Sequence, residues 1–193
     1  MTGSDSRSAG QNNSGRGRAC SRAAAAYAVP VARAATPAIA ALVAAGVAHD
    51  VVQYHHDPRT DSFGAEAVSE LAGAGGLAPE QIFKTLVVSL PRGLGVAVLP
   101  VPSKLSLKAA AAALGAAKAT MADPAAAQRS SGYVVGGISP LGQRKALPTV
   151  VDASALNWDR ILCSAGKRGW DVSLDPRDLV RLTNAVTADI CAL

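Results

Sequence analysis

Residues 82–101 read IFKTLVVSLPRGLGVAVLPV, and this stretch decides how the chain folds. Its first nine residues form a nearly continuous apolar run, which is typical of a buried strand. Pro91-Arg92-Gly93 is a turn signal, and a second apolar run returns from Leu94 to Val101. The pattern therefore predicts a buried β-hairpin.

Lys84 interrupts the first strand of this hairpin with a charge. Lysine is rarely buried without a partner or a purpose, so a functional amine is one interpretation. The other interpretation is a lysine on an edge strand, where its charge discourages pairing with another chain. The strand pattern alone favours neither.

Strands and helices are intermixed around the hairpin. Further strands are predicted at residues 47–54, 117–121, 149–152, 160–164 and 170–174. Helices are predicted at residues 63–71, 106–114 and 176–183, and two more begin at residues 37 and 124. Three of the helix starts place a capping residue directly before a proline, at Thr36, Asp123 and Asp175. Because no strict βαβ rhythm appears, we expect a single mixed α/β domain rather than a doubly wound one.

Charge is distributed unevenly along the 193 residues, whose net charge is +5. Five arginines and one aspartate precede residue 36, which gives this segment +4 and leaves +1 for the rest. The body of the chain is therefore not a broadly basic nucleic-acid binder, and any such contact must come from a local cluster. We expect residues 1–35 to be a disordered tail and residues 36–193 to be the folded domain. A signal peptide is the alternative for the tail, although Pro30 and Arg33 interrupt its weak apolar stretch.

Two further features concern the compartment. No apolar run approaches the roughly 20 residues that a membrane-spanning helix needs. The three cysteines, Cys20, Cys163 and Cys191, lie far apart and form no metal-binding or disulfide pattern. Both features predict a cytoplasmic protein.

Common catalytic signatures are missing from the sequence. Residues 137–142 exceed the G-x-S-x-G spacing by one residue, and no histidine follows residue 56 to complete a hydrolase triad. His55 and His56 are adjacent, so on an extended chain they point to opposite faces and are poorly placed to share a metal. No phosphate-binding or dinucleotide-binding glycine fingerprint appears.

Residues 136–145 read GGISPLGQRK and contain the most unusual loop composition of the chain. Glycines let a ligand approach the main chain, and the adjacent Arg144 and Lys145 would attract phosphate. An ordinary surface turn is the alternative interpretation. Two further cationic groups occur, Lys167-Arg168 between glycines and Arg129 close to Tyr133, whose ring could stack on a base.

Six motifs in one order resemble the YbaK/EbsC family of aminoacyl-tRNA editing proteins, which are related to the insertion domain of bacterial prolyl-tRNA synthetase. The motifs are FKTL at 83–86, MADP at 121–124, AQRS at 127–130, GY at 132–133, VGGISPLGQ at 135–143 and GKRG at 166–169. The resemblance runs from about Thr36 to Ile190. It implies a mixed, barrel-like central sheet surrounded by helices.

The resemblance also implies a hydrolase that removes a wrong amino acid, most readily cysteine, from the 3′ end of tRNA(Pro). Lys84 matches the family's essential lysine. The implied substrate-binding residues are the aromatic and acidic pocket positions and the G-x-x-x-P loop, namely Tyr54, Phe63, Asp171, Gly136, Gly137, Ile138, Ser139 and Pro140. The cations expected to contact tRNA are Arg129, Arg144, Lys145, Lys167 and Arg168.

No metal and no cofactor is expected from this resemblance, because the substrate's own cysteine thiol is the family's proposed nucleophile. Prolyl-tRNA synthetase is an expected partner. Two alternatives stay open: a non-catalytic module that binds an aminoacyl or nucleotide ligand on the same fold, and a deacylase for another mischarged tRNA such as Ala-tRNA(Pro).

Overall fold

The structure, a computed structural model, describes residues 36–60 and 62–192, so the predicted tail at 1–35 lies outside the described residues. Eight strands form one mixed sheet in the order β1-β7-β6-β2-β3-β5-β8, with β4 paired to β2. The strands are β1 (His49–Gln53), β2 (Ile82–Leu90), β3 (Gly93–Pro100), β4 (Thr120–Met121), β5 (Thr149–Asp152), β6 (Ile161–Lys167), β7 (Trp170–Leu174) and β8 (Val186–Ala188). The helices are α1 (Pro37–Ala44), α2 (Phe63–Gly75), α3 (Leu107–Ala113), α4 (Pro124–Ser131) and α5 (Pro176–Thr183), with short 3-10 turns η2 (Pro79–Gln81) and η3 (Ala153–Asn157).

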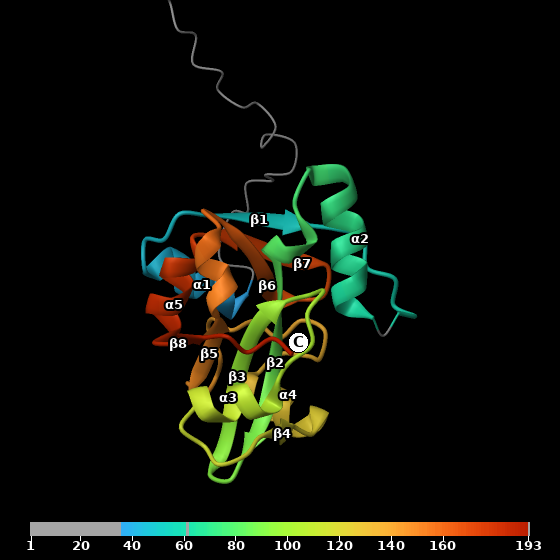
Figure 1. Ribbon diagram of the computed structural model, residues 1–193. Coiled ribbons are helices and arrows are strands. Elements are labelled where there is room, and N and C mark those ends of the chain that lie inside the picture. The colour runs from blue at the N-terminus through green and yellow to red at the C-terminus, as the bar shows by residue number, and fades with distance from the viewer. Residues whose placement is uncertain (1–35, 61, 193) are drawn as a thin grey trace, which may run out of the picture.

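The predicted hairpin is the antiparallel pair β2–β3, which runs in register from Phe83–Pro100 to Leu90–Gly93. Parallel neighbours flank it, β6 beside β2 and β5 beside β3, while β7 and β1 continue the sheet in antiparallel fashion. Figure 1 shows β1 and β7 running across the top of the molecule while β2 and β3 run vertically, so the sheet curves strongly. The expectation of a single mixed α/β domain with helices around a mixed central sheet is confirmed.

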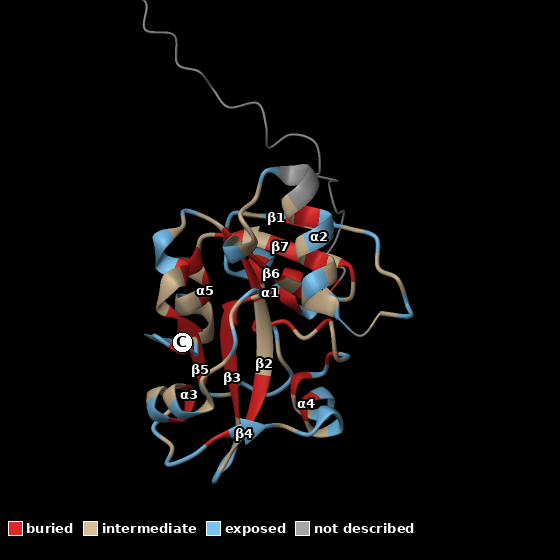
Figure 2. Ribbon diagram, turned by 45° about the vertical axis from the view of Figure 1, so that its right-hand side comes forward, coloured by how far each residue is buried: buried red, intermediate tan, exposed pale blue. Residues whose placement is uncertain are grey.

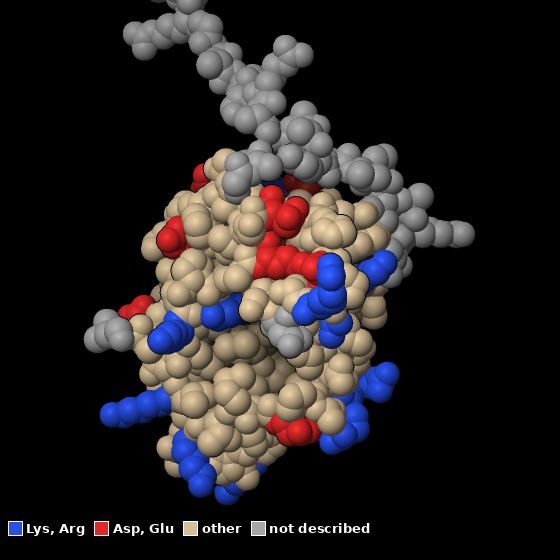
Figure 3. Space-filling view, turned by 90° about the vertical axis from the view of Figure 1, so that its right-hand side faces the viewer, with Lys and Arg blue, Asp and Glu red and all other residues tan. Residues whose placement is uncertain are grey.

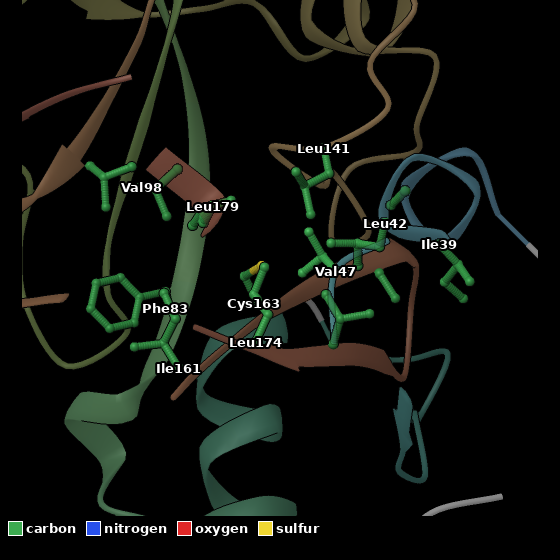
Figure 4. Packing of buried hydrophobic residues seen from close by; sticks show 14 of the residues in the cluster. Ile39, Leu42, Val47, Phe83, Val98, Leu141, Ile161, Cys163, Leu174 and Leu179 are labelled. Carbon is green, nitrogen blue, oxygen red and sulfur yellow. The ribbon is translucent and has the colours of Figure 1, made fainter. Parts of the chain in front are cut away.

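Both faces of β3 are buried, which explains its continuous apolar sequence. Val96 and Val98 face the larger cluster, to which α1, α5, β6 and β7 contribute many of the other side chains. Ala97 and Leu99 face a second cluster built with α3 and the C-terminal residues. Figure 4 shows the larger cluster, where Phe83 and Ile161 lie together and Leu42, Leu141 and Cys163 point into the same space.

The helix starts follow the predicted capping. Thr36 accepts a hydrogen bond from the Ile39 amide at 3.2 Å, Asp123 from Ala126 at 2.9 Å, and Asp175 from Arg177 at 2.8 Å. Each cap satisfies an amide that has no partner within its helix, and proline at the next position needs none. No helix among the described residues is long and apolar enough to cross a membrane.

Element boundaries differ from the predictions at several points. β4 covers only residues 120–121, α2 continues to Gly75, and β6 continues to Lys167. β8 was not predicted at all, because three half-exposed residues show no usable periodicity, and the strand exists only through its parallel pairing with β5.

Candidate active site

A gap in the pairing of β2 marks the candidate site. On one side β2 pairs with β3 along its whole length, but on the other side β6 reaches only Ile82 and Phe83, and β4 reaches only Val88 and Ser89. Residues 84–87 therefore have no strand partner on this side among the described strands. Figure 2 shows the consequence, since β2 is only partly buried along its middle whereas β3 is buried.

A pocket of about 470 Å³ lies at this gap. Its walls come from β2, the start of α2, the first turns of α4 and the loop that carries Val135, Gly136 and Ile138. In Figure 3 the face is hollowed, with lysine and arginine side chains on either side of the hollow and acidic side chains above it. A volume of this size suits a small organic ligand.

Six of the nine predicted catalytic and substrate-binding residues line the pocket: Tyr54, Phe63, Lys84, Gly136, Ile138 and Asp171. Gly137, Ser139 and Pro140 are buried and lie outside the lining. Ser139 shapes the loop from behind, because its hydroxyl accepts the Leu141 amide at 3.2 Å and its carbonyl accepts the Gln143 side chain at 2.9 Å. The structure thus gathers most of the predicted site and assigns the rest of the loop a supporting position.

Lys84 reaches the pocket from β2 and is half-buried. Its ammonium donates to the carbonyl oxygens of Val101 at 2.9 Å and Ser103 at 2.6 Å. None of the ion pairs in the described residues includes Lys84, so no carboxylate neutralises it. Burial lowers the pKa of Lys84 below the ordinary lysine value. A lysine amine has three donor hydrogens, so one remains for a ligand after the two carbonyls are satisfied.

Gly136 is required by a close contact as well as by its backbone. Its φ is +85°, and a Cβ added there would lie 2.6 Å from Cγ of Phe63. The ring of Phe63 is also covered by Arg168, whose guanidinium carbon lies 4.7 Å from the ring centroid. Arg168 in turn donates from Nε to the Val135 carbonyl at 2.9 Å. The ring of Phe63 therefore contacts both the glycine loop and an arginine, and these three residues form one wall of the pocket.

Asp171 lies on β7 and is 5% exposed, and its burial raises the carboxyl pKa to about 7. Tyr54 lies nearby, and the pKa of its phenol is raised by burial and further by the charges of Asp171 and Glu66. A carboxyl group with such a pKa carries a variable negative charge near neutral pH. Perturbed acids in pockets are candidates for ligand recognition.

Two features beside the pocket could not be foreseen from the sequence. His56 Nδ1 donates to the Glu66 carboxylate at 2.7 Å, its ring centroid lies 5.7 Å from that of Phe63, and the amide of Asp57 donates to the same glutamate at 2.7 Å. Thr85 Oγ1 is buried beside the pocket without a hydrogen-bond partner in the described residues. The histidine–glutamate contact joins residues ten positions apart across a loop, and only the fold reveals it. Within residues 36–60 and 62–192, no three His, Cys, Asp or Glu side chains gather closely enough to hold a metal ion.

The predicted tRNA-binding cations lie outside the pocket lining. Arg129, Arg144 and Lys145 meet at the end of α4, since the amides of Arg144 and Lys145 donate to the carbonyls of Ser131 and Ser130 at 2.9 and 3.3 Å. Lys167 is exposed and lies over the ring of Trp170 at 4.7 Å. Arg168, by contrast, is engaged in the pocket wall. Two cationic groups therefore come from segments that adjoin the pocket, one after α4 and one at the β6–β7 turn.

Comparison with known proteins extends this description. Residues 64–182 match the family described as the aminoacyl-tRNA editing domain. A candidate Cys-tRNA(Pro)/Cys-tRNA(Cys) deacylase, EbsC of Enterococcus faecalis, is 39% identical over 131 residues, which are 67% of this chain and 78% of that protein.

Solved structures agree with the family. A candidate trans-editing enzyme for prolyl-tRNA synthetase superposes with a TM-score of 0.71 at 26% identity, over 84% of this chain and 99% of that one. A hypothetical protein superposes with a TM-score of 0.70 at 25% identity, over 81% of this chain and all of that one. The chain therefore belongs to the family of aminoacyl-tRNA editing domains.

Proposed function

We propose that this protein hydrolyses the ester bond of mischarged tRNA(Pro), with Cys-tRNA(Pro) as its preferred substrate. The observation that carries the proposal is Lys84, a cation without a counter-ion in a pocket at the β2 gap, opposite the glycine loop. The family is one of aminoacyl-tRNA editing domains, and the Enterococcus relative is named for this reaction. A cytoplasmic location accompanies the proposal, because charged tRNA is used in translation there.

Hydrolysis of this ester requires few catalytic groups from the protein. The ester that joins an amino acid to tRNA is already activated, so orientation and charge stabilisation can supply the rate. Lys84 would stabilise negative charge on the terminal nucleotide or on the reacting carbonyl. Asp171, when ionised, would pair with the α-ammonium group of the amino acid, while Phe63 and Ile138 would enclose its side chain.

The nucleophile would come from the substrate. Serines and a threonine are among the described residues that line the pocket, but no histidine lines it to act as their base. In the proposed step the cysteine thiol sulfur attacks the ester carbonyl, the carbon–sulfur bond forms, and the bond from the carbonyl carbon to the ribose oxygen breaks. The thiol proton passes to that oxygen, which leaves tRNA and a cyclic thioester that water opens later.

The exposed cations close to the pocket lead us to propose two partners, tRNA and prolyl-tRNA synthetase. Arg129, Arg144, Lys145 and Lys167 are exposed and would contact tRNA phosphates. The body of the chain carries only +1, so its own affinity for tRNA should be modest. A complex with prolyl-tRNA synthetase would then deliver the mischarged tRNA.

The test is a deacylation panel with the purified protein and tRNA(Pro) charged with cysteine, S-methylcysteine, alanine, serine or proline. We expect fast release of cysteine and loss of that rate when the thiol is methylated. Equal rates for cysteine and S-methylcysteine would exclude the thiol as nucleophile, and a preference for alanine would identify an Ala-tRNA(Pro) deacylase. Binding of every charged tRNA without release of any amino acid would indicate a non-catalytic module.

A further inference from the structure

The C-terminal residues hold the loop that in turn holds Lys84. The carbonyls of Val101 and Ser103, which accept the two hydrogen bonds from the Lys84 ammonium, belong to the segment that leaves β3. This segment has no regular structure between Pro100 and α3. Its start is held by hydrogen bonds from the Val101 amide to the Ile82 carbonyl at 2.8 Å and from the Ser103 amide to the Pro100 carbonyl at 3.1 Å. Its end is held by residues 190–192, at the other end of the sequence.

Two backbone hydrogen bonds join the two segments. The Ser106 amide donates to the Ile190 carbonyl at 2.8 Å, and the Ala192 amide donates to the Lys104 carbonyl at 2.7 Å. Together these bonds make the antiparallel bridge between Leu105 and Cys191. The C-terminal segment thus pairs with residues 104–106 like a short strand and fixes the loop from outside the pocket.

Asp152, the last residue of β5, anchors the C-terminal segment. It is 3% exposed, and its Oδ2 accepts the Ile190 amide at 2.9 Å and the Cys191 thiol at 3.2 Å. Its Oδ1 accepts the amide and hydroxyl of Ser154. Burial alone would raise the pKa of Asp152, but hydrogen bonds from Ser154, Ile190 and Cys191 lower it below the ordinary value. The carboxylate is therefore ionised at neutral pH, and both its oxygens are occupied.

Lys84 points to the same face as this anchor. Its cross-strand neighbour Leu99 packs in the cluster that contains Ile190, with Leu105 and Cys191 at the border of that cluster. Directly paired residues of an antiparallel ladder project to one face, so the lysine stem shares that side. Val101 lines the candidate active site, whereas Ser103, Asp152 and Cys191 line a second hollow, so the amine lies where the two hollows approach each other.

From this chain of contacts we infer that Asp152 is a positioning residue for Lys84. It acts through the C-terminal segment 190–192 and the loop 101–106 and touches neither the lysine nor the pocket. The carboxylate fixes Ile190 and Cys191, these fix residues 104–106, and the loop aims the carbonyls of Val101 and Ser103. Two of the three donor hydrogens of Lys84 are thereby directed, which leaves the third pointing in a set direction.

Asp152→Asn tests the inference with little change in volume. The asparagine side chain has one acceptor oxygen, so it can accept hydrogen bonds either from Ser154 or from Ile190 and Cys191, but not from both. Its NH2 group would then face a hydrogen-bond donor in the place of the lost acceptor oxygen. Ser154→Ala is the matched control, because it removes one hydrogen bond to the same carboxylate and leaves the C-terminal segment attached.

The first readout is single-turnover release of cysteine from Cys-tRNA(Pro) at saturating enzyme, together with the enzyme concentration that gives half the maximal rate. For Asp152→Asn we expect a rate loss between about 10-fold and 100-fold, since misplacing a catalytic group by about 1 Å can cost that much. The half-saturating concentration should rise less than the rate falls, because the other pocket residues and the surface cations are untouched. Ser154→Ala should react like the parent.

The second readout does not need the proposed function. The Lys84 ammonium is followed by NMR of protein with labelled lysine, and its pKa is measured directly. In the parent this pKa should lie below that of the exposed lysines, and in Asp152→Asn it should move towards theirs as the loosened amine gains water. A parent protein that deacylates nothing would refute the proposed function, while the NMR titration would still decide the positioning role.

A folded Asp152→Asn variant with an unchanged Lys84 pKa and an unchanged rate would overturn the inference. A rate loss with an equal rise in the half-saturating enzyme concentration and an unchanged Lys84 pKa would also overturn the inference. That pattern indicates a general structural defect. If Asp152→Asn does not fold, Ala192→Pro replaces it. Proline has no amide hydrogen, so this variant removes the Ala192–Lys104 hydrogen bond without adding a charge beside Lys84, and it should shift the Lys84 pKa and the rate in the same directions.

Discussion

The two strands of the central hairpin have similar apolar sequences but different surroundings. β3 is paired on both sides and buried from Gly95 to Pro100, whereas β2 lacks a partner along residues 84–87. The cross-strand pair Lys84–Leu99 shows the difference within a single rung of the ladder. Leu99 is fully buried and serves the core, while Lys84 is half-buried at the pocket. In this fold the candidate site lies where β2 lacks a strand partner. The core is stabilised by β3, which has a strand partner on both sides.

The largest effect should follow from Lys84→Ala. We expect the single-turnover deacylation rate to fall by about 100-fold or more, as when a preorganised charge-stabilising donor is removed. The melting temperature should change little, because the lost group is a partly desolvated cation without a counter-ion. Lys84→Arg should not restore the rate, since a planar guanidinium cannot occupy the place of a compact ammonium. Near-parental turnover by Lys84→Ala would remove this lysine from the site.

The opposite result is expected for its neighbour, Leu99→Ala. Truncating a fully buried leucine should lower the free energy of unfolding by about 2–5 kcal/mol. The deacylation rate of the folded fraction should fall far less than in Lys84→Ala. The rate is measured below the melting transition, and the stability by denaturant unfolding. Equal losses of rate and stability in both variants would erase the distinction between the two strands.

Gly136→Val should alter the pocket beside residues 84–87 of β2 and leave the buried strand β3 unchanged. Valine cannot adopt the φ of +85° without strain, and its Cβ would collide with Phe63 at 2.6 Å. We expect a rate loss greater than the stability loss, followed by deacylation assays and thermal melts. Gly115→Ala is the control, because its φ is +66° but open space surrounds the site of a Cβ, so backbone strain alone acts there. If both variants lose activity equally, strain and not the pocket wall is responsible.

The smallest effect concerns pH and Asp171. Its pKa in the folded protein is about 7, above the ordinary carboxyl value, so the folded state binds more protons than the unfolded state between these two values. The sign follows: stability falls as pH rises from about 4 to 7. Activity should rise as pH increases through about 7, because the ionised carboxylate is the form that can pair with the α-ammonium group. Rate and unfolding profiles of the parent and of Asp171→Asn measure this, and the variant should lose both dependences.

The hairpin, the capped helix starts and the mixed α/β class could all be predicted, because each depends on residues close together in the sequence. Lys84 and the glycine loop could be singled out for the same reason. The gap in β2 could not, since it depends on where β6 and β4 stop pairing. Arg168 was expected to contact tRNA, and its place on the ring of Phe63 needed knowledge of a turn 105 positions further along the chain. The anchoring of residues 190–192 by Asp152 could not be predicted for a similar reason, because the sequence places this residue only at the end of a predicted strand.

The wedged ring of Phe63 has a consequence for how substrates are sorted. An editing enzyme encounters far more correctly charged tRNA than mischarged tRNA. A pocket that excludes amino acids by their size would protect the correctly charged tRNA from hydrolysis. A ring that could swing aside would admit larger amino acids at a modest energetic cost. The Gly136 backbone and the Arg168 guanidinium both contact this ring, and Arg168 is itself bound to the Val135 carbonyl. A displacement of the ring towards either neighbour would therefore disturb these contacts, so we expect this wall of the pocket to limit the size of the amino acid that enters.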